Sequence, residues 1–178
     1  MAIERPNQVW ASDITYVPMR RGFLYLVAVM DWFSRYVLSW ELSATLDTGF
    51  CLAALEAALC QGAPEIFNTD QGSQFTAADF TAALRQRQIR ISMDGRGRWL
   101  DNVFIERLWR SVKYELIYPG DFADGRQLWM ALENDFRFYN HSRPHQALGY
   151  RTPAEVFATC GAQPAVGSDW GSAPNPGI

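Results

Sequence analysis

The sequence is poor in cysteine, and this shortage excludes two kinds of site. Only three of its 178 residues are cysteines. They form no C-x-x-C pair, so the sequence indicates neither a disulfide framework nor a thiolate zinc site. We therefore expect Cys51, Cys60 and Cys160 to be small buried hydrophobes.

Histidine is equally scarce, and the two histidines do not predict a zinc site. His141 and His145 have H-x-x-x-H spacing, which suggests a metal site at first sight. Pro144 lies between them and breaks any regular helix, and no third ligand is evident. Packing or hydrogen bonding is therefore the better interpretation of both rings.

Long apolar runs are also missing. No stretch of 18 or more uncharged apolar residues occurs, and the first ten residues lack the basic and then apolar run of a signal peptide. We expect a soluble, cytoplasmic protein. A hydrophobic content of 48% supports one domain with a real core, which we place at residues 1–157. Residues 158–178 are rich in Gly, Pro, Ala and Ser and predict a disordered tail.

Lysine is nearly absent, and the formal net charge of −3 argues at first sight against a nucleic-acid partner. The distribution of charge matters more than the sum. Residues 82–118 carry eight basic and four acidic side chains and therefore a local charge of +4. The eight are Arg85, Arg87, Arg90, Arg96, Arg98, Arg107, Arg110 and Lys113, the chain's one lysine. The first three of these are as compatible with a solvated helix face as with a DNA path.

The hydrophobic pattern predicts an α/β sandwich. Residues 8–17 and 35–43 alternate as half-buried strands do, and residues 23–30 are continuously apolar, like a central strand. These three predict an antiparallel meander. Further strands are expected at 64–70 and 89–93, and helices at 46–62, 76–88, 103–117 and 125–140, with a short one from Pro153. We expect Thr76 and Asp79 to form a capping box. The order βββαβαβα implies a five-stranded mixed sheet with helices on both faces.

Three acidic residues occupy unusual positions in this pattern. Asp13 lies in the middle of the first strand, where aspartate is disfavoured. Asp70 follows a strand and precedes a glycine-containing turn, at the edge where α/β sheets usually bind ligands. Strands one and four can be neighbours in this topology, and a helix across that edge could add Glu106. Asp31 also ends an apolar strand, but we interpret it as a structural turn or cap.

The predicted helix 103–117 has a polar stripe opposite its apolar one. Asn102, Glu106, Arg110 and Lys113 are spaced three and four apart and project together. A solvated face with an ion pair between Glu106 and Arg110 is an alternative explanation of this stripe. Nearby Trp99 and Trp109 could stack on a base, although tryptophan is more often part of a core or an interface. Asp101 could cap the helix.

Three converging carboxylates repel one another unless cations lie between them. Without cysteine or histidine, the set offers only hard oxygen ligands, which suit Mg²⁺ or Mn²⁺. Two such ions about 4 Å apart would serve phosphoryl transfer. The arginines and the lysine on the same stripe would then meet a phosphate backbone.

Several segments together resemble a known family. They include "VWASDITYV", "NTDQGSQF", "ISMDGRGRWLDNVFIERLWRSVKYE" and "YNHSRPHQALGYRTPAEVF". The chain resembles the catalytic core of bacterial insertion-sequence transposases related to retroviral integrases, the DDE superfamily with an RNase H-like fold. Thirty-five residues separate Asp70 from Glu106, as in that family, and a basic residue, Lys113, follows seven positions after the glutamate. The resemblance spans about residues 6–157.

The resemblance implies specific roles. Asp13, Asp70 and Glu106 match the triad that holds two Mg²⁺ or Mn²⁺ ions for hydrolysis at element ends and strand transfer into target DNA. Lys113 matches a contact to the DNA end, and Asn102 faces the same site. Arg110, as well as Arg96 and Arg98 in the loop that corresponds to the mobile catalytic loop, are the other expected DNA contacts.

The same resemblance implies partners and leaves alternatives open. We expect homo-oligomers that act on element ends and target DNA, in the bacterial cytoplasm or on the nucleoid. We also expect the N-terminal helix-turn-helix region of full-length relatives to be missing from this chain. An RNase H-like nuclease is one alternative, and an inactive DNA-binding or interaction remnant is another.

Overall fold

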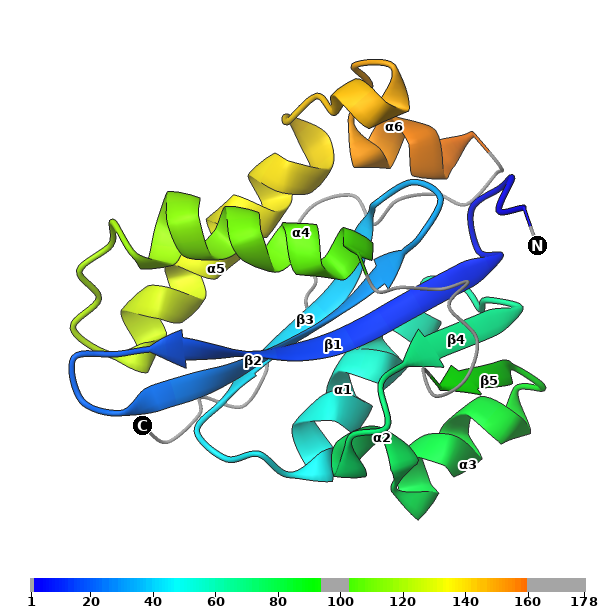
Figure 1. Cartoon of the computed structure of the whole chain (residues 1–178), viewed down its shortest axis with the longest axis horizontal. Coiled ribbons are helices and arrows are strands. Elements are labelled where there is room, and N and C mark those ends of the chain that lie inside the picture. The colour runs from blue at the N-terminus through cyan, green and yellow to red at the C-terminus, as the bar shows by residue number, and fades with distance from the viewer. Residues whose placement is uncertain (1, 94–102, 160–178) are drawn as a thin grey trace.

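The computed structural model describes residues 2–93 and 103–159, and a five-stranded sheet lies at its centre (Figure 1). The strand order is β3-β2-β1-β4-β5. The strands are β1 (Val9–Pro18), β2 (Phe23–Asp31), β3 (Val37–Ser43), β4 (Ile66–Thr69) and β5 (Arg90–Met93). This arrangement confirms the predicted five-stranded α/β fold.

The sheet is mixed, as the sequence predicted. β1, β2 and β3 form an antiparallel meander, whereas β4 pairs in parallel with both β1 and β5. The turn between β1 and β2 closes where Met19 donates its backbone N–H to Gly22. Gly22 has a φ of 74°, which glycine adopts without strain. Because β1 pairs with both β2 and β4, it is the central strand, and the expected contact between strands one and four is present.

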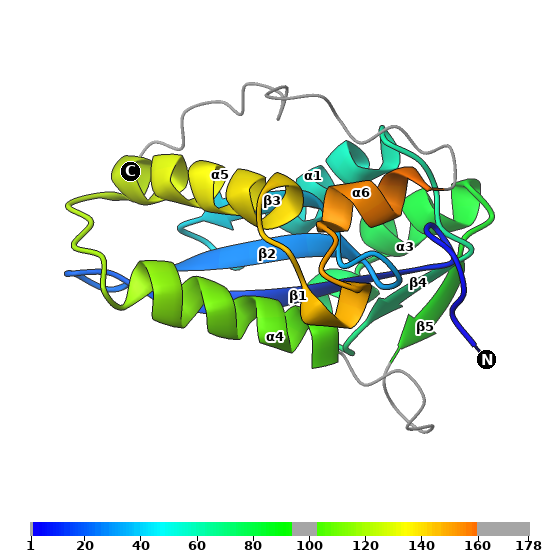
Figure 2. The same ribbon diagram turned by 90° about the horizontal axis from the view of Figure 1, so that it is seen from above.

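Helices cover both faces of the sheet. They are α1 (Thr48–Leu59), α2 (Ser73–Thr76), α3 (Ala78–Gln86), α4 (Val103–Ser111), α5 (Gly125–His141) and α6 (Pro153–Ala158), with short helical segments η1 (Val112–Ile117) and η2 (Gln146–Leu148). Figure 1 shows α4 and α5 above the sheet and α1 and α3 below it; Figure 2 shows the same layers from a second direction. No helix within the described part of the chain is long and apolar enough to cross a membrane.

Two large hydrophobic cores follow from this layering, and a small third cluster surrounds Trp32. On one face, sheet residues such as Val27 and Leu38 pack with α1, α3 and α6. On the other, Leu26 and Trp40 pack with α4, η1 and α5. The alternation of β-strand side chains assigns successive residues to opposite cores, which explains why β2 is continuously apolar up to Met30.

The predicted helix 103–117 changes its hydrogen bonding halfway. α4 ends at Ser111, and the chain continues as a π-helical turn over Val112–Ile117, in which Tyr118 donates its N–H to the carbonyl of Lys113 at 2.8 Å. Such an i to i+5 bond is rare, and π-helical turns inside helices are frequent at functional sites. The sequence pattern gave no sign of it.

Two local predictions were wrong. Cys60 is exposed at the end of α1, although Cys51 is buried as expected. Thr76 does not cap α3: its hydroxyl bonds to the carbonyls of Gly72 and Ser73, because the residue belongs to the separate short helix α2. α3 starts after Ala77 without a side-chain cap.

The helix predicted from Pro153 is confirmed as α6, and its start has a complete capping box. The Thr152 hydroxyl accepts from the N–H of Glu155, whose carboxylate accepts from the N–H of Thr152. Several other predicted features lie outside the described residues. These are Asn102, Arg96, Arg98, Trp99, Asp101, Cys160 and the tail from residue 160.

Asp31 has the structural role that the sequence suggested. Its carboxylate is fully buried and accepts hydrogen bonds from the backbone N–H of Asn7 at 2.7 Å and of Ser34 at 2.8 Å. The Ser34 hydroxyl donates to the same carboxylate at 2.6 Å. Burial raises the pKa of Asp31, while these hydrogen bonds oppose the rise. The carboxylate thereby ties the segment before β1 to the turn between β2 and β3.

We predict that Asp31→Ala lowers the free energy of unfolding by about 3 kcal/mol, because it leaves buried N–H groups without an acceptor. Urea denaturation checks this. Glu56→Ala is the control, since Glu56 is exposed on α1, and it should change stability by less than about 0.5 kcal/mol. Equal losses in the two variants would contradict the structural role of Asp31.

Candidate active site

Asp13 lies on the central strand and faces α4. It is half-buried, and its Oδ2 accepts a hydrogen bond of 2.8 Å from the indole Nε1 of Trp109. Trp109 is itself a member of the core between the sheet and α4. The bond fixes the orientation of the Asp13 side chain, whose carboxylate also accepts a hydrogen bond from the backbone N–H of Ile14.

Asp70 comes to the same edge of the sheet from the neighbouring strand. Ala11 of β1 pairs with Asn68 of β4 in parallel register, so Asp13 and Asp70 each lie two residues further along. Residues two apart on a strand share a face. Asp70 is exposed just after the end of β4, and its Oδ1 accepts from the N–H of Gly72 at 2.9 Å.

Gly72 allows the turn that holds Asp70. A Cβ at this position would lie 2.9 Å from Oδ1 of Asp70, closer than real Cβ contacts. A side chain at Gly72 would therefore displace the carboxylate or break its hydrogen bond. The glycine in "TDQGS" thus serves the position of the aspartate.

Glu106 projects from the first turn of α4. It is exposed, whereas Ile105, Leu108 and Trp109 of the same helix are buried against the sheet. In the described residues Glu106 makes no ion pair, so the alternative of a Glu106–Arg110 pair is not supported. The helix packs against β1, and the negative charge of Glu106 acts on Asp13 of that strand.

The three carboxylates influence one another electrostatically. Burial raises the pKa of Asp13 above its ordinary value, and the negative charges of Asp70 and Glu106 act in the same direction. The hydrogen bond from Trp109 opposes the rise. Since a charge exerts such an effect only at short range, β1, the end of β4 and α4 bring the three acids into one neighbourhood.

The electrostatic influence among the three carboxylates does not by itself make them a set of metal ligands. Over residues 2–93 and 103–159, no three His, Cys, Asp or Glu side chains are grouped closely enough to hold one metal ion. Asp70 and Glu106 are exposed and have room to change rotamer, whereas Asp13 is held by Trp109. The metal-binding role of the triad therefore stays a prediction.

Trp109 is the residue of this site whose contribution the sequence did not reveal. The sequence suggests for Trp109 only base stacking or packing in a core or an interface, and the side chain is 6% exposed. Its place three residues after Glu106 puts it one turn along the same helix. A tryptophan one turn from a proposed acidic ligand was the only signal, and that signal cannot distinguish packing from hydrogen bonding.

The basic residues of the stripe lie beside the acids. Arg110 is exposed in the last turn of α4, and Lys113 is half-buried in the first turn of the π-helical segment. Neither forms a salt bridge within the part of the chain that the structure describes. Both charges are available to an external anion.

The two histidines pack against tyrosine rings. His141 ends α5 and packs edge-on to Tyr36, and His145 packs edge-on to Tyr139. Burial lowers the pKa of both rings. The interpretation of the H-x-x-x-H spacing as packing is consistent with these contacts.

Comparison with known proteins connects this site to a family. The integrase core domain family matches residues 3–98, and a second integrase core domain family matches residues 87–153. The first match covers all of β1 to β5, including Asp13 and Asp70, and the second covers α4 with Glu106.

Curated relatives are transposases of bacterial insertion sequences. The transposase InsF for insertion sequence IS3A of Escherichia coli is 35% identical over 158 residues, which cover 84% of this chain and 54% of that protein. The transposase of IS629 from Shigella sonnei is 31% identical, with 86% of this chain and 52% of that protein covered. The chain therefore spans about half the length of these relatives.

Solved structures agree in fold. The integrase catalytic core domain of HTLV-2, solved with magnesium, has a TM-score of 0.67 at 21% identity and covers 86% of this chain and 97% of that chain. A chain of the simian T-cell lymphotropic virus intasome, solved in complex with the PP2A regulatory subunit B56 gamma, has a TM-score of 0.71 at 19% identity; the match covers 98% of this chain and 63% of that one. The fold is thus that of retroviral integrase catalytic cores, and the chain belongs to the integrase core domain family.

Proposed function

We propose that this chain is the catalytic core of an insertion-sequence transposase. Its reaction is hydrolysis of a phosphodiester at an element end, followed by attack of the freed 3′-hydroxyl on target DNA. The observation that carries the proposal is that the charges of Asp70 and Glu106 both raise the pKa of Asp13, and Arg110 and Lys113 follow Glu106 along the same helical stretch. Membership of the integrase core domain family supports it.

The donor set fits divalent metal ions. Oδ1 of Asp13 is not engaged by Trp109, and Asp70 has one carboxylate oxygen outside its bond to Gly72. Glu106 contributes two more oxygens without a salt-bridge partner in the described chain. Such an all-carboxylate set suits Mg²⁺ or Mn²⁺. When bound, two such ions would activate the attacking oxygen and stabilise the leaving one.

The residues of the chain would position the metal-binding carboxylates and neutralise the charge of the DNA backbone. Trp109 keeps Asp13 in one rotamer, so that the least mobile carboxylate of the set is preorganised. Repulsion among three carboxylates would decrease when cations bind, which allows the exposed Asp70 and Glu106 to approach Asp13. Arg110 and Lys113 would contact the phosphate backbone on the same side of the helix, and Asn102, Arg96 and Arg98 are proposed as further contacts.

The proposed partners are element ends, target DNA and further copies of this chain. The HTLV-2 integrase core was solved in dimeric and trimeric forms, which supports the choice of a homo-oligomer here. The length of the curated relatives supports a further region in the full transposase, for which we propose the recognition of element ends.

We predict that Glu106→Gln and Asp70→Asn each reduce metal-dependent cleavage and joining of DNA by more than about a hundredfold, since each removes a charge from the reacting centre. The substrate is a labelled, pre-nicked branched DNA that mimics a strand-transfer product. Joined products would also distinguish a transferase from a nuclease. Glu56→Gln, at an exposed position of α1, is the matched control and should keep the wild-type rate. Wild-type rates in the triad variants would refute the assignment.

Asp13→Asn should stabilise the metal-free protein at neutral pH. The raised pKa of Asp13 means that the folded state binds its proton more tightly than the unfolded state does. The ionised carboxylate therefore destabilises the fold fully above its folded pKa, and the effect disappears below the unfolded pKa. Urea denaturation with a chelator should show a higher midpoint for the variant at pH 7 and a shrinking difference toward acid. A constant difference at every pH would contradict this account.

Lys113→Ala and Arg110→Ala should weaken DNA binding at low salt for all sequences alike. Each should reduce the slope of log K against log salt by about one, as expected for the loss of one phosphate contact. Fluorescence anisotropy over a range of salt concentrations measures this. Arg126→Ala, an exposed residue of α5 away from the stripe, is the control and should leave the slope unchanged.

A further inference from the structure

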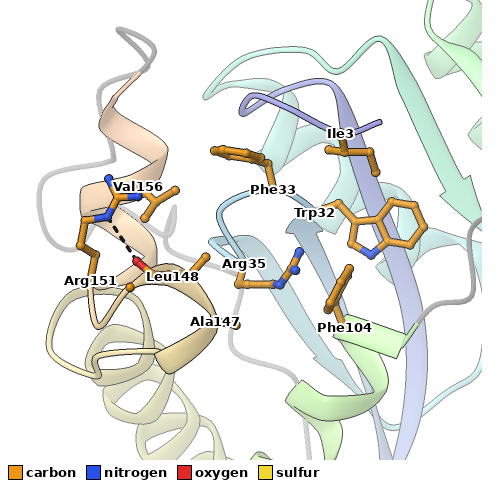
Figure 3. A pocket seen from close by; sticks show the side chains of 10 residues that line it. Ile3, Trp32, Phe33, Arg35, Phe104, Ala147, Leu148, Arg151 and Val156 are labelled. Carbon is orange, nitrogen blue, oxygen red and sulfur yellow. Dashed lines mark hydrogen bonds between the residues drawn. The ribbon is translucent and has the colours of Figure 1, made fainter. Parts of the chain in front are cut away.

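A groove lies on the other side of α4 from the carboxylates. Two adjoining pockets form it, one of 630 Å³ and one of 270 Å³, and they share Arg35, Phe104 and Ala147. The first turn of α4, the turn between β2 and β3, and the segment after α5 supply its walls. Figure 3 shows the larger pocket, with Trp32 and Phe104 facing Ala147 and Leu148 across it.

The groove is lined by cations and by no acidic side chain among the described residues. Its arginines are Arg35, Arg107, Arg143 and Arg151. Arg143 is neutralised by a bidentate pair with Glu115 at 2.6 and 2.8 Å. The other three form no salt bridge in the described structure, so the groove has an excess of positive charge.

Arg35 is the most informative of these cations. Its guanidinium carbon lies 3.1 Å from the centroid of the Phe104 ring, and burial lowers its pKa to about 10. The charge of Asp31 opposes this lowering of the pKa, but the Asp31 carboxylate accepts three other hydrogen bonds, and Arg35 forms no salt bridge in the described structure. A desolvated cation without an anionic partner is costly. A bound anion would compensate that cost.

The backbone at Arg35 points to the same conclusion. Arg35 has a φ of 67°, in the left-handed region that non-glycine residues rarely occupy. Backbone outliers of this kind cluster at functional sites and binding clamps. The strained turn directs a long cationic side chain to the junction of the two pockets.

The groove also offers apolar surface and polar atoms without partners. Ile3, Trp32 and Phe33 line the larger pocket. Nε1 of Trp32 and Nε2 of His145 are buried and make no hydrogen bond in the described structure. Buried polar groups usually have a partner, so each requires an explanation. An indole N–H is a donor, and the His145 ring, which donates to the carbonyl of Tyr139, leaves Nε2 as an acceptor.

We propose that this groove binds an unpaired nucleotide of a DNA strand, with its phosphate against Arg35 and Arg107 and its base in the apolar pocket beside Trp32 and Phe33. Cations alone would suit any phosphate, but the apolar walls require a base that is not stacked in a duplex. The choice of DNA rests on the proposed function: Glu106 and Arg107 are consecutive residues of α4, so one strand could reach both sides of this helix.

The first test follows the indole N–H signal of Trp32 by NMR, using the 178-residue chain, with Trp32→Phe to assign the signal. The chain is titrated with a short single-stranded oligodeoxynucleotide, with the duplex of the same sequence, and with inorganic phosphate. We expect the single strand to shift the Trp32 signal at a lower concentration than the duplex does. A shift with phosphate alone would mean an anion site only, and would overturn the proposal.

A second test uses a charge reversal that the fold should tolerate. Ala147 is exposed and lines both pockets, so Ala147→Glu adds a negative charge there without disturbing a core. We expect about tenfold weaker binding of the single strand, in keeping with the loss of one charge-assisted contact. Ala53→Glu, on an exposed position of α1 outside both pockets, should bind as wild type does. Arg35→Gln should weaken binding as Ala147→Glu does.

The outcomes separate this proposal from the catalytic one. A chain that joins DNA, but whose Trp32 signal does not move and whose Ala147→Glu variant binds normally, would refute the groove and retain the transferase. A chain that fails to join DNA, but whose Trp32 signal shifts with the single strand and no longer shifts in Ala147→Glu, would refute the transferase and retain the groove. Concentration-dependent changes in the Trp32 signal without DNA would mean that a second copy occupies the groove, and would also overturn the proposal.

Discussion

The hydrogen bond from Trp109 to Asp13 joins α4 to the central strand, and the arrangement of the proposed site depends on it. Asp13 is half-buried on β1, where charge is costly, and the indole N–H of Trp109 offsets part of that cost. The bond exists only because α4 packs across the sheet through Leu108 and Trp109. The position of Glu106 follows from the same packing, so fold and site share one helix.

The two faces of the sheet differ in what packs against them. On one side, α1, α3 and α6 form a core with the sheet. On the other, α4 and α5 form the core that supports Asp13 and Glu106. α4 then presents three surfaces: an apolar one to the sheet, an acidic and basic one to the proposed reacting centre, and Phe104 with Arg107 to the groove.

Sequence patterns predicted the sheet well because its strands differ clearly in periodicity. The alternation of β1, the apolar run of β2 and the proline at the start of α6 each have a local physical cause. An aspartate inside a strand also singled out Asp13. The contacts that the patterns missed are nonlocal or depend on exact register: the Trp109–Asp13 bond, the Arg35–Phe104 contact and the π-helical turn at Val112. The cap predicted at Thr76 failed because a separate short helix uses that residue.

The scarcity of lysine has a practical consequence for work on this protein. Lys113 carries the one side-chain amine of the chain, and it lies half-buried beside the carboxylates at the start of the π-helical turn. An amine-reactive reagent therefore has one internal target, apart from the terminal amino group. Acylation of Lys113, measured by mass spectrometry, therefore shows whether a bound molecule covers this surface, and no engineered label is needed.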